Sequence, residues 1–306
     1  MQLDLQEVDS KWLLTTFETL AQRSDKAYGA VLAEIGDRPP WGWSDPFCQE
    51  DPLGTETLDA GIEIVPRSIQ FYRDMGIDVQ PILDRSDMEE RDGKSQHAFC
   101  MNMDREQDIR TFNNVKPTLK WFETVIHELG HAVYELGFDE KLPWLLREPS
   151  HTITTEAMAL LAGRRVYEAK SLRRRQLIFS RWVLVMTAFE SELYRDPSQD
   201  LNRLWWQLVE KVQKIKAPKD RASKYDWAAK HHIGLAPVYY FSYLLGELFA
   251  SAIQESLAAP LNTPKAGQFL QKKLFAPGNR MKWNELVQHV TNRPLTPDAW
   301  VKEFAT

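Results

Sequence analysis

The sequence has 306 residues, with 43 acidic and 38 basic side chains and a formal net charge of −5. A hydrophobic fraction of 43% and an aromatic fraction of 11% exclude wholesale disorder in a chain long enough to bury a substantial core. The mildly acidic balance disfavours a dedicated nucleic-acid binder, because phosphate neutralisation needs surplus Lys and Arg. Cys48 and Cys100 are too few cysteines for a disulfide-stapled scaffold or a cysteine-ligated zinc site. Because no signal peptide or apolar run of membrane-spanning length is visible, we expect a cytoplasmic protein without a membrane partner.

Helical periodicity dominates the chain. Apolar residues recur at spacings of three and four in the segments expected to form helices, which are residues 8–23, 57–74, 118–136, 154–170, 172–193, 198–215, 236–258 and 281–291. One region departs from this pattern, because residues 95–103 and 109–115 flank a polar turn and predict a β-hairpin. The sequence therefore predicts a mainly α fold with one small sheet.

The segment HELGH at residues 127–131 carries an H-E-x-x-H pattern within one of the expected helices. His127 and His131 project from the same face of that helix, so their imidazole nitrogens can reach one metal ion. Glu128 lies about 100° around the helix from His127, where it is better placed to take a proton from a metal-bound water than to bind the ion. Zinc suits this role because it lowers the pKa of bound water towards ~7 without redox chemistry. The pattern predicts one zinc ion per chain.

A catalytic zinc site needs a third protein ligand and leaves one position open for water. Glu156 suits this role because it lies in the opening turn of the next expected helix, a separate element that can pack against the first. Glu135, Glu140 and Glu148 are alternatives. Glu135 points past the ion from the same helix, and the other two lie in a connecting segment where their positions would be loosely determined.

Several residues elsewhere can serve a peptide bound at such a site. An extended peptide needs an edge strand, and the oxyanion that forms during hydrolysis needs hydrogen-bond donors. The expected hairpin around His97 and Ala98 can supply the strand, and His231, His232 or a tyrosine of the following stretch can supply the donors. Each of these side chains, taken alone, is more often structural, so the pattern by itself leaves their roles open.

In chain order, the segments SQHAF, DIR, HELGH, LPWLLREP, TTEA, WAAKHHI and YYFSYLLGE resemble the angiotensin-converting enzyme family of peptidyl-dipeptidases. The resemblance spans roughly residues 10–305, and its last part is similar to the C-terminal helices of that family. Many zinc peptidases share H-E-x-x-H, whereas the spacing from His97 to His127 and the AKHHI element are more particular to this family. The resemblance implies a multi-helical, zincin-like metallopeptidase fold with the small hairpin or sheet beside the HExxH helix.

The resemblance also implies roles for residues of the metal site. His127 and His131 match the zinc histidines, Glu156 matches the third ligand, and Glu128 matches the general base. The aspartate that orients a zinc histidine in this family is replaced by Leu160, so another partner must hold that imidazole.

Further matches concern the substrate. His97 and Ala98 match the pair that hydrogen-bonds the substrate backbone, and Lys230 matches the lysine that binds the substrate's C-terminal carboxylate. His232 matches the histidine near the scissile carbonyl, and Tyr240 matches the tyrosine that stabilises the oxyanion.

Two departures accompany the match at Tyr240, for which Tyr239 is a close alternative. If Tyr240 is the oxyanion tyrosine, Tyr239 replaces the family's chloride-linked arginine, and chloride activation is not expected. Pro237 then replaces a tyrosine that helps to hold the C-terminal carboxylate, which weakens the expectation of strict dipeptide release.

We therefore expect a zinc-dependent metallopeptidase that hydrolyses short peptides from the C-terminal end, as a peptidyl-dipeptidase or a carboxypeptidase-like enzyme. The alternatives are an oligoendopeptidase of the thimet oligopeptidase or carboxypeptidase Taq type, and a truncated, partner-dependent module without activity. Family members are about twice this length, so residues 1–306 are expected to form a single helical catalytic domain that lacks the family's N-terminal half. The absence of that half would leave an apolar face exposed, for which a second copy or a complementary N-terminal chain is the expected partner.

Overall fold

The computed structural model describes residues 2–36, 63–217 and 219–306. The chain divides into two compact units, the first formed by residues 1–55, 168–244 and 300–306 and the second by residues 56–167 and 245–299. Cys48 and residues 57–62, which begin one of the expected helices, lie outside the described residues.

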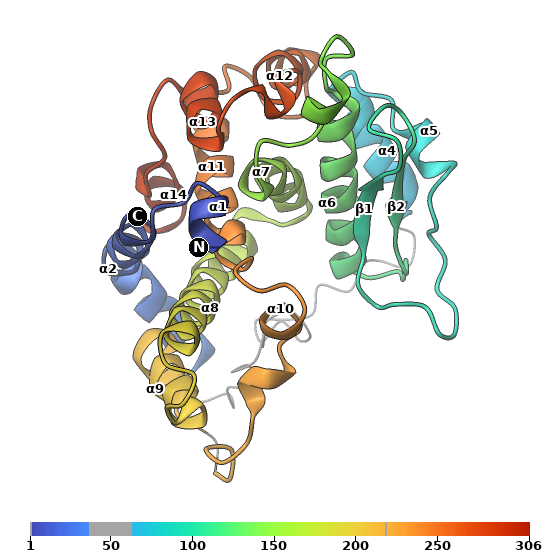
Figure 1. Ribbon diagram of the computed structural model, residues 1–306. Helices are drawn as coiled ribbons and strands as arrows, with labels where there is room; N and C mark the ends of the chain where they lie inside the picture. Colours follow the sequence, from blue (N-terminus) through green and yellow to red (C-terminus); the bar gives the residue numbers. More distant parts are fainter. Residues whose placement is uncertain (1, 37–62, 218) are drawn as a thin grey trace. The chain divides into compact units, whose positions relative to one another are not determined.

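The described part of the first unit is helical (Figure 1). Its elements are α1 (Gln2–Leu5), α2 (Ser10–Ile35), α8 (Ala169–Arg195), α9 (Leu201–Gln213), a 3₁₀ turn at Asp226–Ala229, α10 (His231–Gly234), the beginning of α11 (Phe241–Ser256) and the end of α14 (Asp298–Phe304). Helix α8 packs against α2 and α9. The fully buried Trp205 of α9 makes edge-to-face contacts with Trp182 and Phe189 of α8, at centroid distances of 5.8 and 5.2 Å.

The second unit carries the small sheet and the remaining helices. Its elements are α4 (Ile64–Asp74), α5 (Gln80–Leu83), β1 (Phe99–Asn102), β2 (Ile109–Phe112), α6 (Leu119–Leu136), a 3₁₀ turn at Trp144–Leu146, α7 (Thr152–Gly163), a 3₁₀ turn at Arg164–Val166, the remainder of α11, α12 (Pro264–Leu270), a π turn at Gln271–Phe275, a 3₁₀ turn at Gly278–Arg280, α13 (Trp283–Thr291) and the beginning of α14. Strands β1 and β2 pair antiparallel, with Phe99 opposite Phe112. Both strands contact α6, alongside which they lie in Figure 1.

The mainly α fold with one hairpin beside the HExxH helix is confirmed, although several expected boundaries were wrong. The helix expected over residues 154–170 ends at Gly163, because the next residues form a 3₁₀ turn around the buried Arg164. The helix expected from residue 236 begins only at Phe241, after Val238, whose φ of 56° is incompatible with a right-handed helix. Helices α12 and α14 lie in the last part of the chain, where the resemblance implied C-terminal helices.

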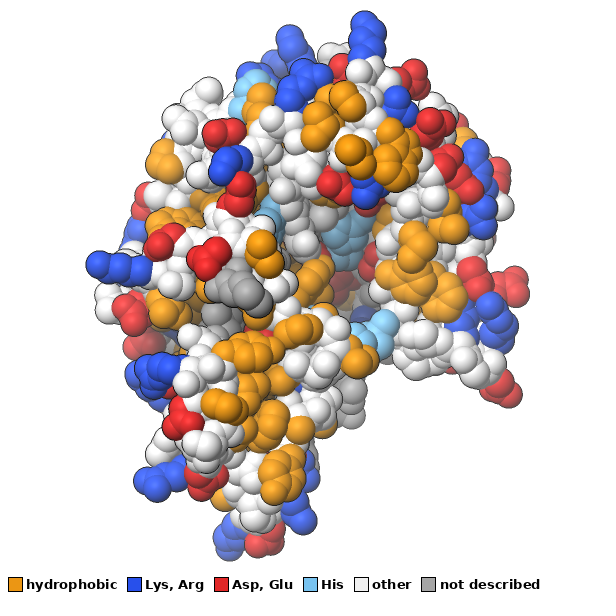
Figure 2. All heavy atoms as spheres, in the orientation of Figure 1, with side chains coloured by type: hydrophobic (Ala, Val, Ile, Leu, Met, Phe, Trp, Pro, Cys, Tyr) orange, Lys and Arg blue, Asp and Glu red, His pale blue; other side chains and the backbone are white. Residues whose placement is uncertain are grey.

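Large apolar side chains are exposed on the second unit. They are Phe99, Met101, Met103, Trp144 and Leu145, and Figure 2 shows orange side chains gathered over β1 and over the top of the unit. Among the described helices, none has the length and apolar character needed to cross a membrane.

Candidate metal centre

Helices α6 and α7 carry the HELGH segment and Glu156. Helix α6 begins after Thr118, whose hydroxyl accepts a hydrogen bond from the Trp121 amide at 3.3 Å. The cap of α7 is His151, whose Nδ1 accepts a hydrogen bond from the Ile153 amide at 3.0 Å. The two helices pack closely because Gly130 of α6 has no side chain, since a Cβ there would come within 2.6 Å of the Ala159 Cα in α7. This approach brings Glu156 to the face of α6 that carries the two histidines.

The structure brings His127, His131 and Glu156 together, with one donor atom from each lying within 4.8 Å of the others. The two Nε2 atoms are 3.2 Å apart, and Glu156 Oε2 lies 3.6 Å from His127 Nε2 and 3.9 Å from His131 Nε2. Donors about 2.0–2.1 Å from a tetrahedral zinc ion lie about 3.4 Å from one another. Two imidazoles and one carboxylate at these separations fit a catalytic zinc site.

Burial keeps the two imidazoles in the form that can bind a metal. It lowers the pKa of His127 to about 4. Burial and the neighbouring His127 also hold the pKa of His131 well below its usual range. Both rings are therefore neutral at pH 7, with a nitrogen lone pair available for a cation.

A hydroxyl group contacts His131 in place of the aspartate for which this chain has Leu160. Thr155, the neighbour of Glu156 in α7, places its Oγ1 at 2.7 Å from Nδ1 of His131. If Nδ1 carries the proton and donates a hydrogen bond to Thr155, Nε2 keeps its lone pair and faces His127. With Leu160 in place of the family's aspartate, the partner of His131 could not be identified from the sequence. A Thr directly before the third ligand was the available signal.

Glu128 is buried beside the donor group, with 7% of its surface exposed. Burial, with a further contribution from the Glu156 carboxylate, raises the pKa of Glu128 to about 8. A divalent cation at the donor group opposes this shift, because positive charge favours the ionised carboxyl group. Glu128 is therefore a carboxyl group able to exchange a proton near neutral pH.

The alternative carboxylates have other partners. Glu148 forms an ion pair with Arg105 at 2.9 Å, and Glu140 accepts a hydrogen bond from Gln107 Nε2 at 3.2 Å. Glu135 interacts with Asn102 of β1, and burial raises its pKa. Among the described residues, the group suited to a metal contains Glu156 and none of these three.

His97 and Ala98 immediately precede β1 in the second unit. His97 is exposed, and its backbone amide donates a hydrogen bond to Ser95 Oγ at 3.3 Å. Cys100, the second residue of β1, is half-buried, and burial together with Glu135 raises the pKa of its thiol. The pair therefore lies next to the strand and not within it, and its role in binding peptides stays a prediction.

Lys230, His232 and Tyr240 belong to the first unit, where they share an aromatic cluster. The His232 ring contacts Tyr240 at a centroid distance of 4.7 Å, and its Nε2 lies 3.2 Å from Tyr243 Oη. Trp182 donates a hydrogen bond from Nε1 to Tyr240 Oη at 2.6 Å, and Lys230 Nζ lies 5.3 Å from the centroid of the Trp182 ring. Sequence analysis missed Trp182 and Tyr243, because nothing in the local pattern separates them from core aromatics.

The fold and the donor group place the chain in the class of metallopeptidases. It belongs to peptidase family M3, whose model matches residues 143–306. The model of the carboxypeptidase Taq (M32) metallopeptidases matches residues 68–172, the part of the chain that contains HELGH. These matches support a zinc metallopeptidase and do not show the narrower angiotensin-converting enzyme family.

Two solved structures have the same fold over nearly the whole of this chain. The M32 carboxypeptidase from Deinococcus radiodurans R1 has 16% sequence identity and a TM-score of 0.71, covering 98% of this chain and 68% of its own. A protein designated BsuCP has 18% identity and a TM-score of 0.71, covering 97% of this chain and 66% of its own. The chain thus spans about two thirds of the length of these neighbours.

Proposed function

We propose that this chain carries the active centre of a zinc-dependent peptidase that shortens peptides from the C-terminal end. The observation that carries the proposal is the group formed by His127, His131 and Glu156, with the buried carboxyl group of Glu128 beside it. The family matches support the peptidase class, and the M32 match favours release of single C-terminal residues over dipeptides. The cytoplasmic location and a partner on the exposed apolar side chains stay predictions.

The residues of the group have separable tasks in this mechanism. His127, His131 and Glu156 would hold the zinc ion, with Thr155 orienting His131. When bound, zinc supplies Lewis acidity, which polarises the scissile carbonyl and lowers the pKa of a coordinated water. Glu128 takes the proton of the attacking water and returns it to the leaving amine.

The remaining assignments come from the sequence resemblance and are part of the proposal. His97 and Ala98 would hydrogen-bond the substrate backbone, and Lys230 would bind its C-terminal carboxylate. His232 and Tyr240 would stabilise the oxyanion. A cluster in which Trp182, Tyr240, Tyr243 and His232 contact one another supports a defined orientation for both side chains.

Mass spectrometry of the products from a mixed peptide library tests the proposal. Single residues released from the C-terminus are expected, whereas dipeptides would favour the peptidyl-dipeptidase type and internal fragments the oligoendopeptidase type. No cleavage by the zinc-loaded protein would contradict the proposal and favour a partner-dependent module.

The variant Glu128→Gln is the matched control for this measurement. We expect it to bind zinc as the wild type does and to lose activity by about 10²–10⁴-fold, because it cannot accept a proton. Unchanged turnover with full zinc occupancy would exclude Glu128 as the general base.

A further inference from the structure

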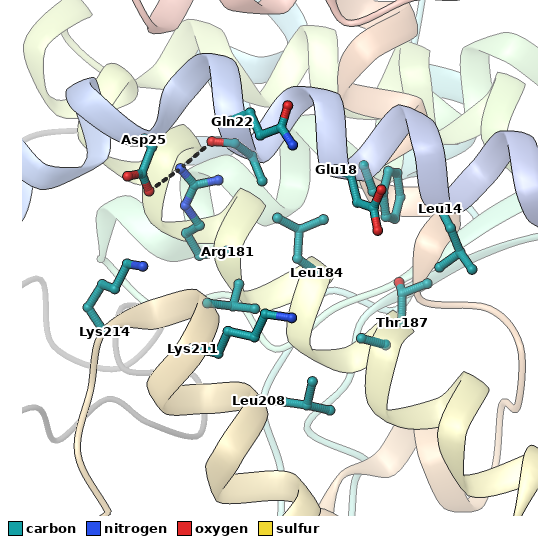
Figure 3. Close-up of a pocket in the computed structure, with 14 residues that line it drawn as sticks. Leu14, Glu18, Gln22, Asp25, Arg181, Leu184, Thr187, Leu208, Lys211 and Lys214 are labelled. Carbon is teal, nitrogen blue, oxygen red and sulfur yellow. Dashed lines mark hydrogen bonds and ion pairs between the residues drawn. The ribbon is translucent and has the colours of Figure 1, made fainter.

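A cavity of about 520 Å³ lies within the first unit, between α2, α8 and α9 (Figure 3). Its size is within the range of small-molecule binding sites. Most of its wall is apolar, and the apolar lining residues are Leu14, Phe17, Ala21, Leu184, Ala188, Leu208 and Val212. The pocket contains none of the residues assigned to the proposed peptidase reaction.

Arg181 of α8 lines this pocket although it is only 1% exposed. Its Nη2 donates a hydrogen bond to the Ala21 carbonyl at 3.1 Å, while Nε and Nη1 are buried and have no acceptor among the described residues. The guanidinium also lies over the Tyr28 ring, 4.8 Å from its centroid, but buried N–H donors without acceptors are costly because they have lost water. The same desolvation lowers the pKa of Arg181.

The nearest carboxylate compensates this charge only in part. Asp25 of α2 lies 3.7 Å from Arg181 Nη2, which is beyond hydrogen-bond length, and its side chain is 63% exposed. An exposed carboxylate at this distance is screened by water and is free to turn into solvent. The guanidinium therefore lacks a closely bound counter-ion among the described residues.

The cations of the pocket lie away from Leu14 (Figure 3). Arg181 and Lys214 stand at one end with Asp25, Lys211 and Leu208 lie near the middle, and Leu14 lies at the other end beside the carboxylate of Glu18. The Thr187 hydroxyl, which also lines the pocket, is buried without a hydrogen-bond partner among the described residues. This arrangement suits a molecule with an anionic head and an apolar body.

We propose that the pocket between α2, α8 and α9 binds a small amphipathic carboxylate, with its carboxyl group on Arg181 and its apolar chain along Leu184 and Leu208. The carboxylate takes the place of Asp25 as the counter-ion of the guanidinium, with Lys214 at the rim as a second cation. The apolar chain fills the part of the cavity that α2 and α9 enclose. No covalent step is involved.

Isothermal titration calorimetry of the whole chain with decanoate tests the proposal. We expect one molecule bound per chain with a submillimolar dissociation constant, and at least about tenfold weaker binding of the neutral decanamide, because a charge-assisted contact is lost. Acetate, which has the head without the chain, should bind more than about tenfold more weakly than decanoate. Equal affinity for decanoate and decanamide, or no binding of decanoate at 1 mM, would overturn the proposal.

Variants locate the binding in this pocket. Arg181→Gln should weaken decanoate binding at least about tenfold, and Lys214→Ala should weaken it to a smaller extent.

A second variant is needed because replacing the buried Arg181 can also disturb folding. Ala188→Leu places a larger side chain at the half-buried pocket wall, where it should fill the cavity and abolish binding while the circular dichroism spectrum is unchanged. The exposed Lys224, outside the pocket, is the matched control, and Lys224→Ala should bind as the wild type does. Wild-type affinity in a folded Ala188→Leu variant would place decanoate elsewhere and refute the site.

Discussion

The contacts of His131 show how the orientation and tautomer of one imidazole can be set. Its Nδ1 lies 2.7 Å from Thr155 Oγ1, and its Nε2 lies 3.2 Å from the corresponding atom of His127. A hydroxyl can accept a hydrogen bond from Nδ1–H and so favour the tautomer in which the Nε2 lone pair is available to a metal. Unlike a carboxylate, it adds no negative charge to a buried group that already contains Glu128 and Glu156.

Replacing Thr155 tests this arrangement at the scale of one residue. We expect Thr155→Val to weaken zinc binding about 10–100-fold, because the orienting contact to His131 is lost. Competition with a chromogenic chelator measures this affinity without reference to activity. Thr155→Ser should restore it, and Thr124→Val in α6, which removes a hydroxyl bonded to the Lys120 carbonyl, is the control. A valine variant that binds zinc normally would show that Thr155 has no orienting role.

At the scale of elements, the metal group depends on how closely α7 approaches its neighbours. A Cβ on Gly130 would meet the Ala159 Cα at 2.6 Å, and one on Gly246 of α11 would meet the Glu156 Cβ at 3.0 Å. The position of Glu156 therefore depends on Gly130, where a Cβ would clash, and on Gly246, where a Cβ would fit only tightly.

Gly130→Ala should displace α7 and loosen the metal site. We expect it to destabilise the protein by about 1–3 kcal/mol through overpacking and to weaken zinc binding, because Glu156 moves with α7. Urea denaturation and chelator competition measure the two effects. Gly29→Ala in α2 is the control, since a Cβ there meets no atom within 4 Å, and it should stabilise the protein by about 0.5–1 kcal/mol. If both variants had the same effect, close packing would not be the cause.

The end of α7 is attached to α11 by a buried ion pair. Arg164 Nε donates to Glu247 Oε2 at 2.8 Å, and Nη1 donates to Ser251 Oγ at 3.1 Å. Both charged side chains are at most 4% exposed.

Removing one partner of this pair leaves a buried charge without compensation. We expect Arg164→Met to cost about 3–5 kcal/mol of unfolding free energy, whereas the double variant Arg164→Met/Glu247→Leu should recover most of it. Chemical denaturation of the wild type, both single variants and the double variant gives the four unfolding free energies of a double-mutant cycle. A double variant as unstable as the sum of the single variants would contradict a coupled pair.

At the scale of the whole molecule, the residues with predicted roles are distributed over both units. The second unit contains His127, His131, Glu156 and Glu128, so a metal would bind there without help from other parts of the chain. The first unit contains the aromatic cluster and the α2–α8–α9 pocket. Stability gained from zinc should accordingly concentrate in one unit.

Removal of zinc with a chelator tests this division. At a zinc concentration of 100 times Kd the bound metal stabilises the folded state by about 2.7 kcal/mol, so the apo protein should melt roughly 5 °C lower. Hydrogen exchange should lose protection in α6 and α7 more than in α8 and α9. A His127→Ala/His131→Ala variant is the control, and its melting temperature should not respond to the chelator. A uniform loss of protection would contradict a site confined to the second unit.

Much of the fold was predictable because it depends on local periodicity. Helix α6 ends where the pattern and Gly137 indicate, and the hairpin follows from alternation around a polar turn. The wrong boundaries lie where tertiary contacts determine the backbone conformation. One example is Arg164, which forms an ion pair with Glu247 in α11, a helix far along the chain. Val238 is another case, since Glu190 of α8 accepts a hydrogen bond from its amide at 2.5 Å at a positive φ.

The sequence by itself determined that His127 and His131 share a helix face with Glu128 beside them, because positions along one helix follow from its period. Only the tertiary structure decided which carboxylate joins them, since that depends on how α7 packs on α6 through Gly130. It also decided that Thr155, rather than an aspartate, faces His131, and that Arg181 lines a pocket. Contacts between distant elements are set by packing and desolvation, which no short-range pattern encodes.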